Sequence, residues 1–268
     1  MTQFALNHMT VAQLSFHGLV ALASRLGCVG IEARNDLPQP LFDGVSPDRA
    51  GALVRQTGLR LLAVAEVKRF NDWSGDKAAE AVTLMKIARA AGAEAVSLIP
   101  RNDNQGLGNG ERQAALRVAL KALKPMLEDY NLIGMVEPLG FEICALRHKA
   151  EAVEAIEAVG GTGRFKLVHD TFHHTLAGGG PLFPDHTGIV HVSGVTDQTV
   201  SLSEMRDPHR VLVTPTDRLG NTDQIAALQA AGWEGPVSFE AFSPDVHALA
   251  EPEAALRASM ELLAGVSA

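Results

Sequence analysis

Four short apolar runs in the second half of the chain each end at, or close to, an ionisable side chain. These side chains are Glu137, Asp170, His191 and Glu240. Short apolar runs of this kind are typical of buried strands, and ionisable groups at their ends are typical of a site. Three carboxylates and one imidazole would form a hard, anionic pocket suited to Mn²⁺, Mg²⁺, Co²⁺ or Zn²⁺, and no thiolate favours a softer metal. The four residues therefore predict a site for one divalent cation.

Each of these residues taken alone has a simpler interpretation. A glutamate at a strand end is commonly a solvated rim residue, and a histidine within a strand is commonly a hydrogen-bonded core residue. The case for a metal depends on all four occurring at successive strand ends. Without a cation, three carboxylates within a few ångströms of one another could not all stay ionised. A bound metal would make such a cluster tolerable.

The elements that must position these residues alternate along the chain. Eight apolar runs are expected to be strands: Phe4–Leu6, Val29–Ile31, Leu61–Ala65, Ala95–Ile99, Ile133–Val136, Phe165–Val168, Gly188–Val192 and Val237–Phe239. Most are separated by segments with helical periodicity, which indicates parallel strands joined by crossovers. Eight such repeats favour an α/β fold with a single closed (β/α)₈ TIM barrel over residues 1–268. In a parallel barrel the strand ends meet at one mouth, so the four side chains would converge.

Local signals predict where the helices begin and end. Thr10 shows a capping-box pattern and is expected to begin the first helix, and Asn221 is expected to cap a later one. Pro125, inside a helical segment, is expected to kink that helix or split it. One last helix is expected over 248–263. The stretch 193–219 is long for a connection and is expected to be a functional rim or lid.

The composition narrows the classes of function. No apolar run approaches the roughly 20 residues that span a bilayer, and the N-terminus lacks a secretory signal pattern, so we expect a cytoplasmic protein with no membrane partner. The net charge of −8 argues against a nucleic-acid partner, because non-specific nucleic-acid binding depends on Lys and Arg. The two cysteines, Cys28 and Cys144, predict neither a CxxC zinc site nor a disulfide framework.

The order of the motifs resembles that of the xylose isomerase-like TIM barrels, which include sugar isomerases, ketose 3-epimerases and endonuclease IV-type nucleases. The likeness is carried, in order, by FALNHMT, GIEAR, VEPLGFEIC, LVHDTFHH, VHVSGVTD and VSFEAFSP. Within the family it is strongest to 2-keto-myo-inositol (inosose) isomerases. The resemblance implies the four metal ligands named above, with Glu137 and Glu240 also acting as general acid and base. It further implies that His173 contacts a substrate oxygen and that the chain forms a homodimer.

Further polar residues are expected at the same mouth, where they would bind a small polyol or ketose. They are Asn7, Arg34, Glu66, Trp73, Arg101 and Arg210. A polyol needs many donors and acceptors and an aromatic wall for its C–H face. Alternatively, Arg34 forms a structural salt bridge, Trp73 begins the next helix and Arg210 is solvated. His169 is expected to point away from the mouth, because neighbouring residues of a strand alternate in direction.

These observations predict a metal-dependent isomerase or epimerase of a ketose or keto-inositol. Such an enzyme removes a proton beside a carbonyl and returns one to the neighbouring carbon, while a metal stabilises the enediolate. The rivals are an inosose dehydratase of the same fold, an endonuclease IV-type nuclease and an inactive binding protein. A nuclease of that type would need histidines that the second and fourth strands lack. Ser193 and Gly194 stand where members of the family often have an aspartate, which leaves the substrate open.

Overall fold

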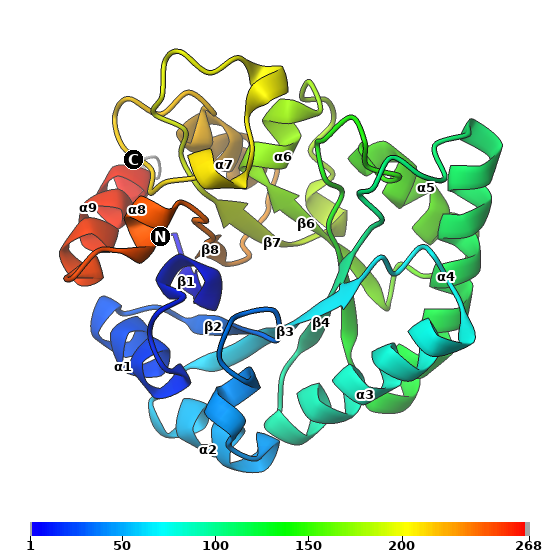
Figure 1. Ribbon diagram of the computed structural model, residues 1–268, viewed down its shortest axis with the longest axis horizontal. Helices are drawn as coiled ribbons and strands as arrows, with labels where there is room; N and C mark the ends of the chain where they lie inside the picture. The colour runs from blue at the N-terminus through cyan, green and yellow to red at the C-terminus, as the bar shows by residue number, and fades with distance from the viewer. Residues whose placement is uncertain (1, 266–268) are drawn as a thin grey trace.

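A computed structural model describes residues 2–265, which form a closed barrel of eight parallel strands in chain order. The strands are β1 (Phe4–Asn7), β2 (Gly30–Arg34), β3 (Arg60–Lys68), β4 (Ala95–Ile99), β5 (Ile133–Val136), β6 (Phe165–Asp170), β7 (Thr187–Val192) and β8 (Val237–Phe239). Each strand pairs with the next, and β8 pairs with β1 to close the sheet. Figure 1 shows the strands enclosed by a ring of helices. The predicted (β/α)₈ barrel is confirmed.

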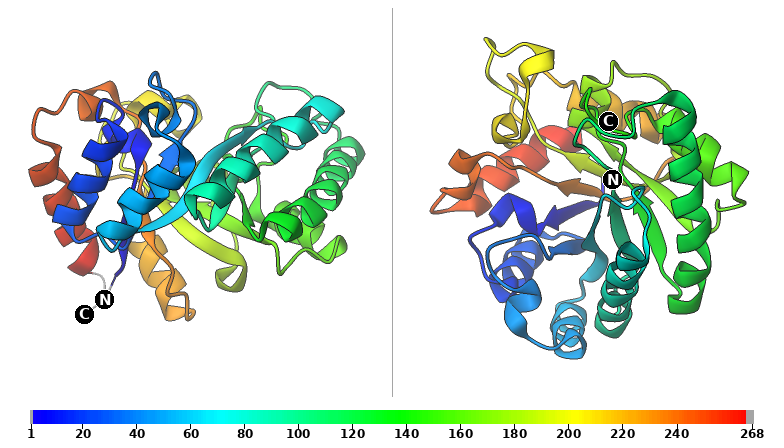
Figure 2. Two further views of the ribbon diagram at one scale, coloured as in Figure 1. Left: turned by 90° about the horizontal axis from the view of Figure 1, so that it is seen from below. Right: turned by 45° about the vertical axis from the view of Figure 1, so that its right-hand side comes forward.

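The helices cover the outside of the barrel (Figure 2). They are α1 (Phe16–Leu26), α2 (Pro47–Gln56), α3 (Gly75–Ala91), α4 (Asn109–Tyr130), α5 (Lys149–Ala158), α6 (Thr171–Leu176), α7 (Asn221–Ala230), α8 (Pro244–His247) and α9 (Pro252–Ala264), with short 3₁₀ turns η1 (His8–Val11), η2 (Leu41–Gly44), η3 (Pro184–His186), η4 (Leu202–Glu204) and η5 (Asp207–His209). Their apolar faces pack on the strands in one large core. None of the helices in this part of the chain is long and apolar enough to cross a membrane.

A smaller apolar layer lies inside the barrel. Ala5, Val168 and Ile189 form a buried cluster and stand two residues before Asn7, Asp170 and His191 on their strands. Because strand side chains alternate with a period of two, these residues share the inner face with the polar residues that follow. The inner layer therefore forms an apolar floor, and the polar side chains lie above it at the C-terminal ends of the strands.

The first helix begins later than predicted. Ser15 is the N-cap of α1, and its hydroxyl accepts the backbone N–H of Gly18 at 3.0 Å. Thr10 lies in η1, where its hydroxyl donates to the carbonyl of Phe239 at 2.7 Å and accepts the N–H of Ala241 at 2.9 Å. The capping prediction for Thr10 was wrong because its hydroxyl joins the end of β1 to the end of β8.

Two further helix starts differ from the prediction. Asn221 is the first residue of α7 and not its cap, because Gly220 precedes the helix in a left-handed conformation and the Asn221 side-chain amide donates to the Ser193 carbonyl and to Asp217, both at 2.8 Å. The helix predicted over 248–263 is α9, which begins later, at Pro252, and the short α8 lies before the predicted range. Pro252 has no N–H to donate, so it begins a new helix more readily than it continues an old one.

The remaining predictions concern Pro125 and the long connection. Helix α4 is not split at Pro125 but continues through it as one element. The β7–α7 connection, yellow in Figure 1, is long as predicted and contains η4 and η5. It is fixed by an antiparallel bridge between Gly194 and Val211 and by the Arg218 guanidinium, which donates to the Val200 carbonyl at 2.7 Å. This connection carries Arg210 toward the mouth.

Candidate metal centre

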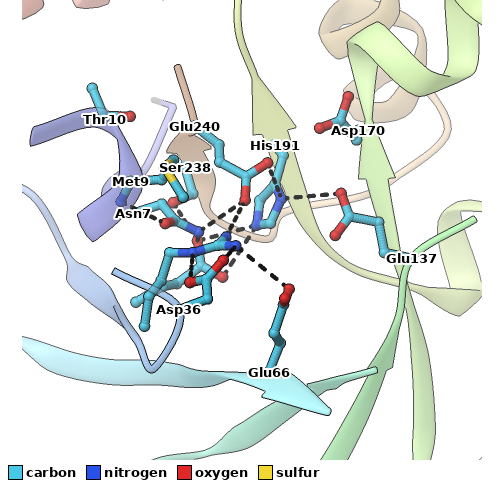
Figure 3. A network of polar contacts seen from close by, with 12 residues as sticks. Asn7, Met9, Thr10, Asp36, Glu66, Glu137, Asp170, His191, Ser238 and Glu240 are labelled. Atoms are coloured by element: carbon cyan, nitrogen blue, oxygen red, sulfur yellow. Dashed lines mark hydrogen bonds and ion pairs between the residues drawn. The ribbon is translucent and has the colours of Figure 1, made fainter. Parts of the chain in front are cut away.

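The four predicted ligands come together at the C-terminal ends of β5 to β8. Asp170 ends β6 and His191 is the penultimate residue of β7, whereas Glu137 and Glu240 directly follow β5 and β8. One ligand atom from each residue lies within 4.8 Å of the other three. All four side chains are buried, with relative exposures of 2 to 4 %. Figure 3 shows Glu137, His191 and Glu240 directed toward one another, with Asp170 nearby.

Asp170 is positioned by the helix that follows it. It is the N-cap of α6, and its Oδ1 accepts the backbone N–H of His173 at 2.9 Å. An N-cap satisfies one of the free N–H groups of a helix, so the start of α6 fixes the carboxylate. The other oxygen, Oδ2, is left for the mouth, where the Arg210 guanidinium contacts it.

One ring nitrogen of His191 forms hydrogen bonds, and the other faces the remaining candidate ligands without one. Its Nε2 donates to both carboxylate oxygens of Glu32 at 3.1 Å. Its Nδ1 forms no hydrogen bond, yet lies 3.3 Å from Glu240 Oε2 and 3.5 Å from Glu137 Oε1. A carboxylate that orients a histidine in this way is typical of metal centres. A buried ring nitrogen that faces two carboxylates without a hydrogen bond favours a cation between them, either a proton or a metal ion, so the residues fit a divalent metal.

Burial and charge act differently on the ionisable groups of this cluster. Burial, and then repulsion from Glu240, raise the pKa of Glu137 to about 7. Burial also opposes ionisation of Glu240, but His191, Arg210 and Arg34 outweigh it and hold the pKa of Glu240 below its usual range. For His191 burial is outweighed by the nearby carboxylates, which raise its pKa well above the usual value. The charges of this cluster therefore balance only with protons or with a cation such as a metal ion.

Two buried arginines hold the oxygens of Glu240 from opposite sides. Arg34 Nη1 lies 2.7 Å from Oε1, and Arg210 Nη2 lies 3.0 Å from Oε2. Arg210 Nη2 also lies 2.5 Å from Asp170 Oδ2, and Asp36 accepts two 2.8 Å hydrogen bonds from Arg34. Such charge-assisted, forked hydrogen bonds fix a carboxylate strongly. Glu240 is therefore held in one orientation from both halves of the barrel.

The mouth is a cavity of about 370 Å³, a size that accommodates small ligands. Of the predicted substrate-binding residues, Arg34, Glu66, His173 and Arg210 line it, together with Glu137 and Glu240. Its aromatic walls are Phe141 and Phe242, which sequence reasoning did not single out. The mouth thus combines apolar ring surface with charged donors and acceptors, as a polyol requires.

Trp73 and Arg101, both expected at this mouth, line a different cavity. Trp73 packs against the main hydrophobic core. Arg101 does not line the mouth; it pairs with Asp72 at 3.2 Å and, at 2.8 Å, with Asp103, which does line it. The expectation for these two residues is not met, because apolar packing holds the indole and local carboxylates hold the guanidinium.

Asn7 lies at the site but beneath its surface. It is 1 % exposed, and its amide donates to Glu32 and to Glu240, each at 3.3 Å. Sequence reasoning missed Ser238, which donates to Glu32 at 2.6 Å, and Asp36. Alternation could have found Ser238, because it stands two residues before Glu240 on the same face. No periodic signal could have found Asp36, which lies in the loop after β2.

Comparison with known proteins places the barrel in a family. The sequence model of the xylose isomerase-like TIM barrel matches residues 20–266, and no curated protein matches the chain. A xylose isomerase domain-containing protein from Salmonella typhimurium LT2 is 29% identical, with coverage of 98% of this chain and 97% of that one and a TM-score of 0.91. The IolI protein, solved with a zinc atom, is 20% identical, with coverage of 99% and 98% and a TM-score of 0.84. A D-allulose 3-epimerase from Methylomonas sp. is 15% identical, with coverage of 98% and 96% and a TM-score of 0.73.

The family match begins within α1 and continues past the last strand, and the match to the Salmonella protein covers nearly the whole chain. The match includes β2 to β8 and therefore all four residues of the candidate metal centre. The chain belongs to the xylose isomerase-like TIM barrel family.

Proposed function

We propose that the protein is a metal-dependent isomerase or epimerase of a ketose or keto-inositol, and most specifically an isomerase of inosose (2-keto-myo-inositol). The observation that carries this proposal is the pairing of two glutamates, Glu137 and Glu240, with Asp170 and His191 around one point of a polar mouth. The likeness to the IolI protein and to a 3-epimerase supports the reaction class. Sugar isomerases and epimerases among the structural neighbours make an enzyme the expected kind of protein.

The residues that would hold the metal are Glu137, Asp170, His191 and Glu240. Three carboxylates and a neutral imidazole suit Mn²⁺, Mg²⁺, Co²⁺ or Zn²⁺, and the IolI neighbour was solved with zinc. When bound, such a cation stabilises the negative charge that develops on the oxygens of an α-hydroxyketone during proton removal. Glu32 would keep the His191 ring in the tautomer that leaves Nδ1 free for the cation.

The chain's own residues would bind the substrate and move the proton. One of the two glutamates takes a proton from the hydroxyl-bearing carbon beside the carbonyl. In an isomerase the other returns a proton to the former carbonyl carbon, while the hydroxyl proton passes to the former carbonyl oxygen. In an epimerase the other returns a proton to the same carbon from the opposite face. Arg34 and Arg210 keep the Glu240 carboxylate oriented toward the cavity. His173, whose Nδ1 has no hydrogen-bond partner in the structure, lines the mouth and is free to contact a substrate hydroxyl. Phe141 and Phe242 would pack against the C–H face of the substrate.

The proposal is tested by following proton exchange. The metal-loaded protein is incubated in D₂O with inosose and a panel of ketoses, and deuterium in the recovered sugars is measured by NMR and mass spectrometry. We expect deuterium at the carbon beside the carbonyl and a product of the same composition as the substrate. Glu240→Gln should abolish exchange, whereas Glu154→Gln on the exposed surface of α5 should not.

Two outcomes of the same experiment would contradict the proposal. Absence of exchange with every substrate would remove the enediolate chemistry altogether. A product lighter by one molecule of water would identify a dehydratase, which uses the same proton removal but expels a hydroxide.

A further inference from the structure

A second group of buried polar residues lies outside the mouth, between β6 and the helices that cover it. Lys149, the first residue of α5, is 8 % exposed, and its Nζ lies 2.6 Å from Nδ1 of His169. His169 is fully buried and points toward α5 and α7, away from the mouth as the alternation of the strand predicts. Within residues 2–265, Lys149 forms no ion pair with a carboxylate, which is unusual for a buried lysine.

The tautomer of His169 follows from its other neighbour. The Gln224 amide nitrogen donates to the Leu219 carbonyl at 2.7 Å and to the Thr175 hydroxyl at 3.0 Å, so its oxygen must face His169 Nε2, 2.9 Å away. His169 Nε2 therefore carries the hydrogen, and Nδ1 accepts one from Lys149. This single neutral acceptor uses one of the three hydrogens of an ammonium group. The other two find no acceptor in the part of the chain that the structure describes.

Lys149 borders a cavity of about 180 Å³, named here the Lys149 cavity. The lining also includes Arg147, His174 and the backbone at the start of α5. Arg147 donates to the Gly140 and Leu176 carbonyls, both at 3.0 Å, and pairs with no carboxylate among residues 2–265. The charge at this cavity is therefore predominantly positive.

Asp170 is the one carboxylate on the wall of the Lys149 cavity, and it is already engaged. Its oxygens accept from the His173 N–H and from the Arg210 guanidinium on the side of the mouth. It therefore does not serve as the counter-ion of Lys149. The positive end of the α5 dipole adds to the field of the lysine, and such helix starts bind anions readily.

We infer that the Lys149 cavity is a binding site for a small oxyanion, a carboxylate or a phosphate group, with Lys149 as its counter-cation. A volume of about 180 Å³ holds roughly six water molecules at about 30 Å³ each, enough for such a group. Burial lowers the pKa of Lys149 to about 7, as befits an amine that lacks a counter-ion in the folded protein. His173 lines both this cavity and the mouth, so the two sites adjoin, but the inference does not rest on the proposed reaction.

Calorimetry on the full chain tests the inference. Metal-free protein in EDTA is titrated with inorganic phosphate and, separately, with acetate, at constant ionic strength set with chloride. We expect one equivalent of at least one anion to bind, with an affinity reduced at least tenfold in Lys149→Met and unchanged in Lys121→Met on the exposed face of α4. Binding of phosphate alone assigns a phosphate site, and binding of acetate alone assigns a carboxylate site.

The result that would overturn the inference is binding of neither anion to the wild-type chain, or equal affinity in Lys149→Met. A crystal of the wild-type protein soaked in phosphate gives a second test that does not depend on the folding of a variant. Density within hydrogen-bond distance of Lys149 Nζ supports the site, and phosphate found only elsewhere contradicts it.

Discussion

The two halves of the barrel contribute to the candidate metal centre in different ways. Strands β5 to β8 supply the four candidate ligands, one per strand. Strands β1 and β2 supply none of them, but Asn7, Glu32 and Arg34 contact Glu240 or His191 directly. The first half thus orients what the second half presents, and their contacts lie across the closed barrel between residues more than 150 positions apart in the chain.

The difference lies in how completely each group is satisfied. Arg34 is fully engaged, with two hydrogen bonds to Asp36 and one to Glu240. His191 keeps Nδ1 without a hydrogen bond, facing the other ligands. Buried polar groups in proteins are normally paired, so an unpaired atom amid satisfied neighbours marks where a ligand belongs. The first half of the barrel therefore contributes side chains that orient Glu240 and His191, and the second half contributes the candidate metal ligands.

The largest expected effect comes from changing the second half. Glu240→Gln keeps the size of the side chain but removes a charge that binds metal and moves a proton. We expect the deuterium exchange rate to fall by a factor of about 10³ or more, in line with the loss of an acid–base group. If Glu240→Gln exchanged deuterium into the substrate as fast as the wild type, Glu240 would not take part in the proton transfer.

The next effect is on stability and comes from the first half. Arg34→Met would remove a buried cation that pairs with Asp36, Glu66 and Glu240, and breaking a buried ion pair typically costs roughly 3–5 kcal/mol in the free energy of unfolding. Arg101→Met is the matched control, because its partners are exposed and such pairs contribute about 0–1 kcal/mol. Urea denaturation of the metal-free variants measures both. Equal losses of unfolding free energy in the two variants would show that Arg34 stabilises the protein no more than a surface arginine does.

Lys149 extends the comparison, because it is a buried charge that pairs with no carboxylate among the described residues and only with the neutral His169. Its pKa is about 7 when folded and near 10.5 when unfolded, so the unfolded chain binds more protons between these pH values. The lysine therefore costs stability at low pH, and this cost disappears as the pH rises toward 10.5. In phosphate-free buffer Lys149→Met should raise the free energy of unfolding by on the order of 5 kcal/mol below pH 7.

Measuring the unfolding free energy of Lys149→Met at several pH values separates the effect of charge from the effect of packing. The gain should shrink steadily between pH 7 and pH 10, whereas Lys121→Met on the surface should show no such trend. A gain that did not change with pH would mean that the effect comes from packing and not from the charge.

The smallest expected effect concerns the orientation of His191. Glu32→Gln keeps a hydrogen-bond acceptor for Nε2 but removes the charge that strengthens it. Loss of such a partner typically weakens metal binding by about 10- to 100-fold. Competition with a chelator of known affinity measures the change. Glu94→Gln serves as control, because Glu94 is exposed at the N-terminal end of β4, whereas the site lies at the C-terminal ends of the strands. An unchanged metal affinity in Glu32→Gln would show that the charge of Glu32 does not strengthen metal binding by His191.

The sequence predicts the barrel and the candidate ligands better than it predicts the tertiary contacts of other side chains. The strands that lead to Glu137 and Asp170, with four and six residues, are visible locally, because strand burial and direction follow from a period of two. The partner of Thr10 is not visible, because its hydroxyl bonds to β8 at the far end of the chain. Trp73 was misplaced for the same reason, since which surface an indole packs on depends on tertiary contacts.

The central claim is that Glu137, Asp170, His191 and Glu240 hold one divalent metal ion. The most direct test is a crystal of the protein grown with Mn²⁺ and measured near the manganese absorption edge. We predict a single anomalous peak inside the barrel mouth, in contact with an oxygen of each carboxylate and with Nδ1 of His191. A map with no peak among these four side chains, or with metal bound only elsewhere, would contradict the account.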